Sequence, residues 1–188
     1  STSRRQRQMC IRDSVYFDDK IWLIGGSQID PDNSSNVVWC FDPKGGGAWE
    51  NRGAAQWRKR MGHAVLVFEN QIWVMGGRDA AGNALNDVWT LDVRNGNREW
   101  TLQTSNVPWA PRCLFNPTVF AGEIWLYGGV KEPFSDRLYD DLYTYANGKW
   151  TQKEMTGIIT GDNDSRRPVA SSLQVFKGDL YLLSLIHI

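Results

Sequence analysis

Histidine and cysteine, the side chains that most often act as catalytic bases, nucleophiles or zinc ligands, are scarce in this 188-residue chain. It has two histidines and three cysteines, and no pair of them has the short spacing of a zinc site. His63, Cys40 and Cys113 fall in short apolar runs, where a structural role is favoured over catalysis. The sequence therefore favours a protein without catalysis of its own, and predicts no cofactor and no metal site.

Two acidic runs superficially resemble calcium loops. They are Asp30–Asn33 and Asp162–Asp164. Neither has the glycine and the distal glutamate that such a loop needs at fixed offsets. The two runs are therefore weak candidates for metal ligands.

A repeated element must position any site, because three similar segments recur along the chain. They read IWLIGG, IWVMGG and IWLYGG, at spacings of 51 and 52 residues. A phenylalanine stands four residues before each segment, and a fourth copy begins at Val175. The other shared positions are the diglycines and a later tryptophan, namely Gly25, Gly26, Gly76, Gly77, Gly128, Gly129, Trp49, Trp100 and Trp150. A repeat of about 50 residues indicates an array of similar structural units.

Each unit contains four short apolar or alternating runs, which predict four β-strands. Pairs such as Glu69-Asn70, Lys177-Gly178 and Asn147-Gly148 suit tight hairpin turns between them. No stretch of a dozen residues keeps the 3.6-residue period of a helix, so helices should be nearly absent. The expected fold is therefore all-β.

These motifs, in three copies that keep one register, resemble the kelch family over residues 15–182. The marks are the diglycine endings, the third run of the type Asp-Val-Trp, and the tryptophan of the fourth run. The resemblance implies a kelch-type β-propeller fragment of about three four-stranded antiparallel blades plus the start of another. The blades would cover approximately residues 15–59, 60–111, 112–167 and, in part, 168–182. Family propellers usually close with six or seven blades, so the remaining blades or domains are implied partners.

The two ends of the chain do not fit the repeat. Arg4–Ser14 reads RRQRQMCIRDS and Leu183–Ile188 reads LSLIHI. Codons can be chosen that make the second string the reverse complement of the first over their shared length, as in a sequencing adapter read at both ends of a DNA fragment. We therefore expect residues 1–14 and 183–188 to be non-native, and the fold is predicted without them. The first strand of the first blade should then be missing.

Recurring aromatic and charged positions have structural interpretations. Rings such as Trp22 and Trp73 recur in one register, which favours packing between neighbouring blades over stacking on a ligand. Asp87 and Asp141 precede equivalent third strands, and we expect their carboxylates to accept hydrogen bonds from backbone amides. Arg60 and Arg112 stand eight residues before the phenylalanine of their units, and each is expected to form a structural ion pair.

Strand reversal predicts which face carries a site. In an antiparallel four-stranded blade, the second–third loops and the inter-blade connections emerge together, and here both are long. Function tends to lie on loops that a rigid scaffold holds. The candidates on this face are Trp57, Arg58, Arg78, Asp79, Trp109, Arg112, Lys131, Glu132, Phe134, Asp136, Arg137, Asp162, Asp164 and Arg166. The two tryptophans could be anchors for a partner or could instead fold back over the blade ends.

The balance of charged residues limits the kinds of partner that the chain is expected to bind. The chain has 21 basic and 21 acidic residues, which argues against a nucleic acid or an anionic membrane surface. The sequence therefore favours a binding or interaction scaffold that uses the long-loop face for a protein or carbohydrate ligand.

The alternative is a carbohydrate-active propeller. The resemblance to the kelch family brings in sialic acid mutarotases and copper radical oxidases of the galactose oxidase kind. This chain cannot supply the two histidines that such a copper site requires, but it could be the part of an oxidase that lacks the ligands. Fold alone does not decide between the two functions.

Overall fold

The computed structural model describes residues 11–27, 34–132, 139–154 and 171–184. Regular structure in these ranges is almost entirely antiparallel β-sheet, and the one helical segment is a 3-10 turn at Arg94–Gly96. The same ranges contain no helix with the length and apolar character that a membrane crossing requires. The fold is therefore all-β, as the sequence predicts.

The strands fall into four successive units, with a two-residue strand, β5 (Arg60–Met61), between the first and second. The first unit consists of β1 (Ile11–Phe17), β2 (Lys20–Ser27), β3 (Ser35–Phe41) and β4 (Trp49–Ala54). The second consists of β6 (Ala64–Phe68), β7 (Gln71–Asp79), β8 (Ala84–Leu91) and β9 (Thr101–Thr104). The third consists of β10 (Thr118–Phe120), β11 (Glu123–Tyr127), β12 (Leu142–Ala146) and β13 (Lys149–Lys153), and the fourth contains β14 (Ser171–Phe176) and β15 (Asp179–Ser184).

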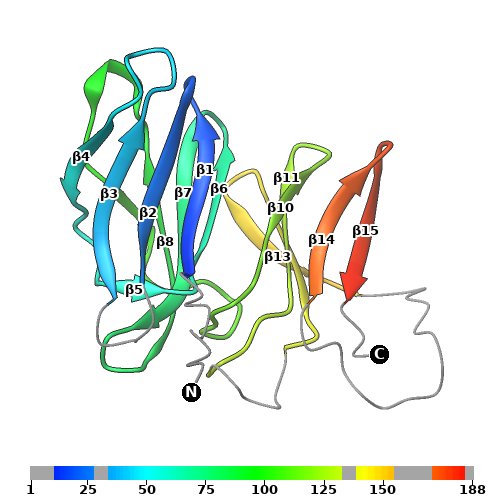
Figure 1. Cartoon of the computed structure of the whole chain (residues 1–188). Helices are drawn as coiled ribbons and strands as arrows, with labels where there is room; N and C mark the ends of the chain where they lie inside the picture. The colour runs from blue at the N-terminus through cyan, green and yellow to red at the C-terminus, as the bar shows by residue number, and fades with distance from the viewer. Residues whose placement is uncertain (1–10, 28–33, 133–138, 155–170, 185–188) are drawn as a thin grey trace, which may run out of the picture.

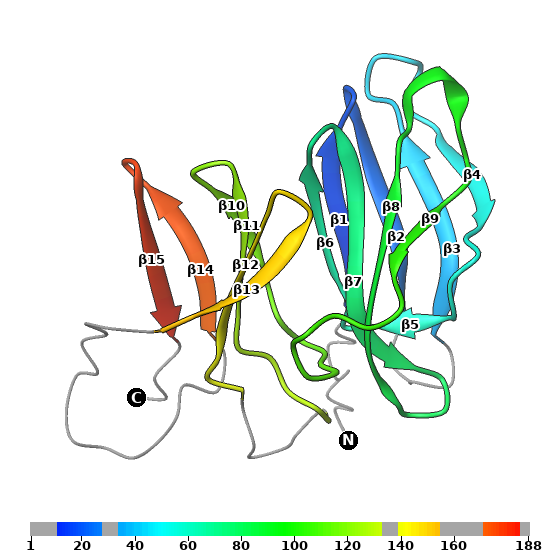
Figure 2. The same ribbon diagram turned by 180° about the vertical axis from the view of Figure 1, so that it is seen from behind.

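Within each unit, strands pair with their neighbours in chain order, and consecutive units stand side by side (Figures 1 and 2). The first strands β1, β6, β10 and β14 contact one another in succession. They therefore form the inner side of the array, and the later strands lie progressively further out. Such sheets around a common inner row have the arrangement of a β-propeller.

Two-residue turns connect the first and second strands of every unit. Asp18, Asp19, Glu69 and Asn70 all have positive φ, between 48° and 58°. Positive φ at both central positions defines the hairpin turn whose twist matches that of the flanking strands. The tight hairpins that the sequence predicts are thus confirmed, and their turns all lie at one end of the sheets (Figure 1).

Two hydrophobic clusters hold the units together. One combines Trp22 and Val38 of the first unit with Val74 and Trp100 of the second. The other joins the second and third units and includes Trp73 and Trp150. The recurring rings therefore pack between units, as predicted.

Trp49 departs from this pattern, because its exposed fraction is 48% whereas those of Trp100 and Trp150 are 7% and 9%. The later two tryptophans pack edge-on against indoles that belong to the connection from the preceding unit. No described unit precedes the first, so Trp49 has only Phe41 beside it, with ring centroids 5.2 Å apart. A shared register position consequently has two different environments.

A buried arginine joins the strands within the second and third units. Arg112 donates to both carboxylate oxygens of Asp141 at 2.6 and 2.7 Å, and to the carbonyl of Gly128 at 2.8 Å. Arg60 makes the same bonds to Asp87 and Gly76. Both arginine side chains are fully buried, and the side chains of Asp87 and Asp141 are only 19% and 20% exposed, so these are largely buried bidentate ion pairs.

The expected ion pair is therefore present, but the expectation that backbone amides occupy Asp87 and Asp141 is wrong. The arginine takes both carboxylate oxygens, because a planar guanidinium matches a carboxylate with two parallel bonds. Although burial by itself raises the pKa of Asp87, the hydrogen bonds and charge of Arg60 lower it below its usual value.

The diglycines are required by close contacts, one with the following unit and one within their own unit. A Cβ on Gly76 would lie 2.8 Å from the carbonyl oxygen of Arg112, and one on Gly77 would lie 2.7 Å from the Cβ of His63. Both glycines have positive φ, and the amide of Gly77 donates to the carbonyl of Arg112 at 2.8 Å. Only glycine combines that backbone conformation with so little space.

The first unit has its first strand, which corrects the expectation that it is missing. Ile11–Phe17 forms β1 and pairs with β2, with Val15 opposite Trp22. Asp13 stands opposite Ile24, at the position that Ala64 occupies in the second unit. Its Oδ2 is buried without a hydrogen-bond partner among the described residues, and burial raises its pKa to about 7. A carboxyl group is therefore poorly matched to this position.

We expect the buried ion pairs to contribute strongly to stability. Asp141→Ala leaves the guanidinium of Arg112 buried and uncompensated, so the free energy of unfolding should fall by about 3 kcal/mol in urea titrations. The matched control is Asp92→Ala, which breaks an exposed Asp–Arg pair and should cost much less. Equal losses in the two variants would contradict the importance of the buried pair.

Replacing Asp13 should stabilise the protein in a pH-dependent way. In the folded state Asp13 stays protonated up to a pKa of about 7, whereas the unfolded chain loses the proton near pH 4. Its contribution to stability therefore falls as the pH rises from about 4 to about 7. Asp13→Ala should gain roughly 2 kcal/mol at pH 8 and much less at pH 4.5, measured by urea unfolding.

The Nε2 of His63 lies 3.7 Å from the Oδ2 of Asp13. The contribution of His63 to stability has the opposite pH dependence. Burial, followed by the charge of Arg60, lowers its pKa from 6.5 to about 3. Its contribution to stability is therefore lost as the pH falls from about 6.5 to about 3, in the parent and in Asp13→Ala alike. An advantage of Asp13→Ala that is equal at both pH values would show that the carboxyl does not titrate as stated.

Candidate interaction face

The long connections that the structure describes, at residues 55–63, 80–83 and 105–117, lie at the end of the sheets opposite the hairpin turns (Figure 1). The loop between β7 and β8 shows how they are held. The Oδ1 of Asp79 accepts the amide of Asn83 at 2.8 Å, and Arg78 Nε donates to the carbonyl of Gly82 at 2.9 Å. Although burial alone raises the pKa of Asp79, these bonds from Asn83 lower it. Asp79 is therefore an ionised residue that organises the loop.

Trp57 and Trp109 are not on the surface of this face, so they are not available as anchors. Their exposed fractions are 2% and 1%. Each indole lies beside the buried guanidinium three residues later, with Arg60 5.3 Å from the ring of Trp57 and Arg112 5.6 Å from that of Trp109. The two tryptophans cover the blade ends, which was the other possibility open from the sequence.

The remaining candidates divide into buried and exposed groups. Arg112 is buried in its pair with Asp141, and Asp79 is buried at the base of its loop. Arg58 and Lys131 are exposed, and Arg78 is half-buried. Arg58 reaches Asp79 at 3.5 Å while its side chain keeps 74% exposure. The described part of the face thus presents mainly basic side chains, together with the exposed Glu132, above a buried frame.

Other sequence candidates lie outside the described residues. They include the acidic run at Asp30–Asn33 and the residues Phe134, Asp136, Arg137, Asp162, Asp164 and Arg166. Glu132 is described and exposed. Among the described residues, no group of three or more histidine, cysteine, aspartate or glutamate side chains could hold a metal ion.

Leu114 is a surface residue that the sequence reasoning missed. It is 45% exposed and has φ of 55°, a conformation that side chains other than glycine rarely adopt. Its amide donates to the carbonyl of Gly62 at 2.8 Å, and Gly62 occupies the equivalent position of the preceding unit with φ of 59°. Aligning the two units reveals a leucine where its neighbour has glycine, which was the available signal.

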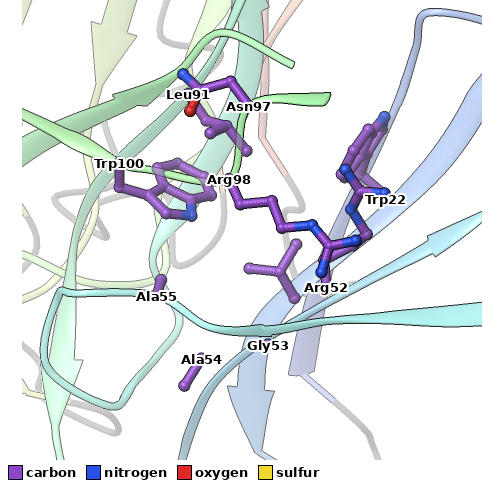
Figure 3. A pocket seen from close by; sticks show the side chains of 10 residues that line it. Trp22, Arg52, Gly53, Ala54, Ala55, Leu91, Asn97, Arg98 and Trp100 are labelled. Carbon is purple, nitrogen blue, oxygen red and sulfur yellow. The ribbon is translucent and has the colours of Figure 1, made fainter. Parts of the chain in front are cut away.

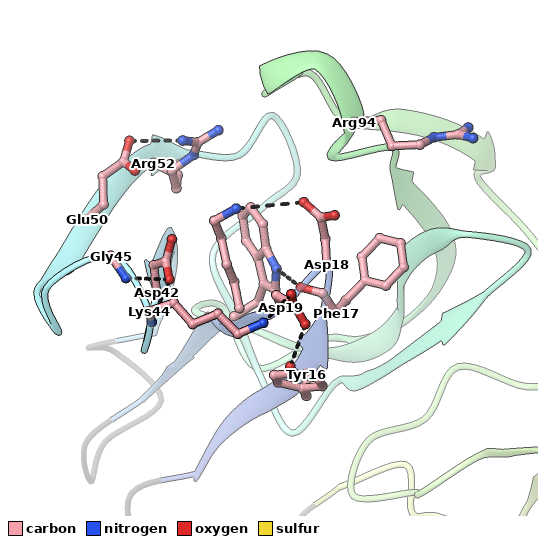
Figure 4. A network of polar contacts seen from close by, with 12 residues as sticks. Tyr16, Phe17, Asp18, Asp19, Asp42, Lys44, Gly45, Glu50, Arg52 and Arg94 are labelled. Atoms are coloured by element: carbon pink, nitrogen blue, oxygen red, sulfur yellow. Dashed lines mark hydrogen bonds and ion pairs between the residues drawn. The ribbon is translucent and has the colours of Figure 1, made fainter.

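The opposite face, at the hairpin turns, has a different character (Figure 4). Lys44 pairs with Asp19 at 2.7 Å, and Tyr16 donates to the same carboxylate at 2.9 Å. Arg52 pairs with Glu50 at 2.9 Å. The charges drawn there are largely satisfied by one another, whereas Lys131 on the long-loop face has no ion pair among the described residues.

Most of the chain, including the strands, diglycines and buried arginines described above, matches one family model. Residues 11–183 match the KLHDC2/KLHL20/DRC7 Kelch-repeats domain. The chain belongs to the kelch-repeat family. Its units are therefore kelch blades, and the blade connections form the candidate interaction face.

Curated relatives share the repeat at low identity. Alpha-scruin of Limulus polyphemus is 32% identical over 143 residues, which are 70% of this chain and 14% of scruin. Kelch-like protein 40 of Mus musculus is 27% identical over 146 residues, 71% of this chain and 21% of that protein. The tRNA wybutosine-synthesizing protein 2/3/4 of Oryza sativa subsp. japonica is 33% identical over 73 residues, 39% of this chain and 7% of that protein. The chain thus spans only a small share of each relative.

We expect relief of backbone strain at Leu114 to be measurable. Leu114→Gly should raise the free energy of unfolding by up to about 1 kcal/mol, because glycine adopts positive φ without a steric penalty. Leu102→Gly is a matched control, since Leu102 is also 45% exposed but lies in strand β9. It should lower stability by about 1 kcal/mol, and a similar loss in both variants would show that Leu114 is not strained.

Proposed function

We propose that the chain is part of a non-catalytic kelch propeller that binds a protein partner through its long-loop face. The observation that carries this proposal is the contrast between the buried residues that hold the blade connections and the exposed residues above them. Arg60 and Arg112 are fully buried and hold the blade connections in place, while Arg58, Leu114 and Lys131 remain exposed above them. Rigid loops that present exposed side chains are well suited to binding, because little conformational entropy is lost.

Similarity supports a scaffold of this kind. Kelch-like protein 40 and Alpha-scruin align with about 70% of this chain. In the part of the chain that the structure describes, no group of three or more histidine, cysteine, aspartate or glutamate side chains could hold a metal ion, and His63 is buried against the carbonyl of Ile24. The carbohydrate-active alternative has no observation that favours it on this face.

The partner should combine acidic and apolar groups. Arg58, Arg78 and Lys131 supply positive charge, and Leu114 supplies an exposed apolar side chain beside them. Complementary charge increases the rate of encounter, and an apolar contact at the centre of the surface slows dissociation.

The test selects peptides from a phage-displayed random library on the purified protein and measures their Kd by fluorescence anisotropy. Arg58→Ala, Leu114→Ala and Lys131→Ala should each weaken the selected peptides about tenfold. Lys44→Ala and Arg94→Ala, on the hairpin face, should change Kd less than about twofold. Peptides that respond to Lys44 or Arg94, and not to the long-loop residues, would refute the proposed face.

A further inference from the structure

The contact between the first and second blades has a close counterpart between the second and third. Trp22 and Trp100 line a recess in the first contact, and Trp73 and Trp150 line the equivalent recess in the second. The recesses lie between the outer strands of neighbouring blades. Each also includes residues of a blade connection, but neither includes Arg58, Leu114 or Lys131. Because most of their lining residues correspond one to one, differences between the recesses arise from a few substitutions.

In the first contact the protein fills the recess with its own side chains. Arg52 and Arg98 lie between Trp22 and Trp100 (Figure 3). Arg98 pairs with Glu50 at 3.1 Å, which ties the second blade to the first. The remaining cavity is only about 10 Å³.

A hydrogen bond from a backbone amide to a side chain also closes this first contact. The amide of Trp100 donates to the side-chain oxygen of Gln56 at 3.1 Å, across the two blades. Together with the pair between Arg98 and Glu50, it draws the outer strands together.

The second contact has none of the side chains that close the first, which are those of Arg52, Arg98, Glu50 and Gln56. Counted from the fourth-strand tryptophan, Gly148 stands where Arg98 stands in the preceding blade, and Thr101 stands in place of Glu50. Pro108 takes the place of Gln56 and has no amide oxygen in its side chain to bridge the blades. A cavity of about 340 Å³ remains between the blades, within the lower part of the range typical of small-molecule sites.

The walls of this cavity are aromatic. The ring of Tyr145 lies 5.1 Å from that of Trp73 and 5.2 Å from that of Trp150, between centroids. None of the described residues that line the cavity carries a charge. A charged ligand would lose hydration there without gaining a counter-charge, so the chemistry favours an uncharged one.

The rim offers a paired acceptor and donor. Gln103 uses its amide nitrogen to donate to Thr90 at 2.8 Å, which leaves its side-chain oxygen as an acceptor. Asn106 uses its side-chain oxygen to accept from Asn86 at 2.6 Å, which leaves its NH₂ group as a donor. A purely apolar guest would cover these two groups without replacing their hydrogen bonds to water.

We propose that the cavity between the second and third blades binds a neutral sugar in its pyranose form. The C–H face of such a ring packs on Tyr145, the partly exposed aromatic side chain of the lining, since Trp73 and Trp150 are only 3% and 9% exposed. Its hydroxyl groups bond to Gln103 and Asn106 at the rim. Asn106, Val107 and Pro108 of a blade connection contribute to the lining, but Arg58, Leu114 and Lys131 do not, so the site does not depend on the function proposed above.

The experiment titrates the purified protein with methyl β-D-glucopyranoside, methyl β-D-galactopyranoside and methyl N-acetyl-β-D-glucosaminide, using saturation-transfer NMR. N-acetyl-L-tyrosinamide and N-acetyl-L-prolinamide are included to represent peptide side chains. Gln103→Arg introduces the arginine that Arg52 supplies in the first contact, and should weaken the bound glycoside at least about tenfold by filling the cavity. Gln152→Arg, the same change at an exposed position of β13 outside the cavity, should alter binding less than about twofold.

Asn106→Ala is a second variant that removes only the donor, and should weaken the glycoside about fivefold. Urea unfolding of each variant shows that it is folded, and Asn106→Ala decides the outcome if Gln103→Arg is not. Binding of a glycoside that Gln103→Arg or Asn106→Ala weakens and Gln152→Arg leaves intact supports the site. Failure of every glycoside to bind, binding that is indifferent to both cavity variants, or binding of the two amino-acid amides alone overturns it.

Discussion

The buried arginine at the start of the second and third units is the interaction on which the rest of the structure depends. The side chain of Arg112 bonds to Gly128 and Asp141 of its own blade, while its backbone bonds to Leu85 and Gly77 of the blade before. One residue thus bonds to two strands of one blade and to residues at the ends of two strands of the next. Since a fully buried guanidinium is tolerated only when its charge and donors are satisfied, the diglycine carbonyl and the aspartate must stay where they are.

This constraint shapes the surface. Trp57 and Trp109 stand three residues before Arg60 and Arg112, and each indole covers the guanidinium that follows. The next blade's tryptophan then packs edge-on against that indole, as Trp100 does against Trp57 with centroids 5.8 Å apart. The blade connection is therefore fixed from below, and only side chains that point away from this stack remain available to a partner.

Small differences between the repeats give equivalent blade contacts different structures. The turn between β8 and β9 is long and carries Arg98, whereas the turn between β12 and β13 is the two-residue Asn147-Gly148 hairpin. The long turn reaches the preceding blade and closes the gap, and the short one cannot reach it. A change in turn length that leaves each sheet intact thus converts a filled contact into a cavity of about 340 Å³.

Much of this architecture follows from the sequence alone, because its determinants are local and periodic. The diglycine register, the alternating runs and the hairpin pairs such as Glu69-Asn70 specify four-stranded antiparallel units. The register also identifies Arg60 and Arg112 as structural. Tertiary packing alone decides which face a side chain meets. It joins each arginine to a carboxylate 27 or 29 residues away, buries Trp57 and Trp109, and leaves Trp49 exposed. It also determines that Leu114 adopts a glycine conformation at the surface and that one blade contact is closed and the next open, since both depend on distances between units that no local pattern encodes.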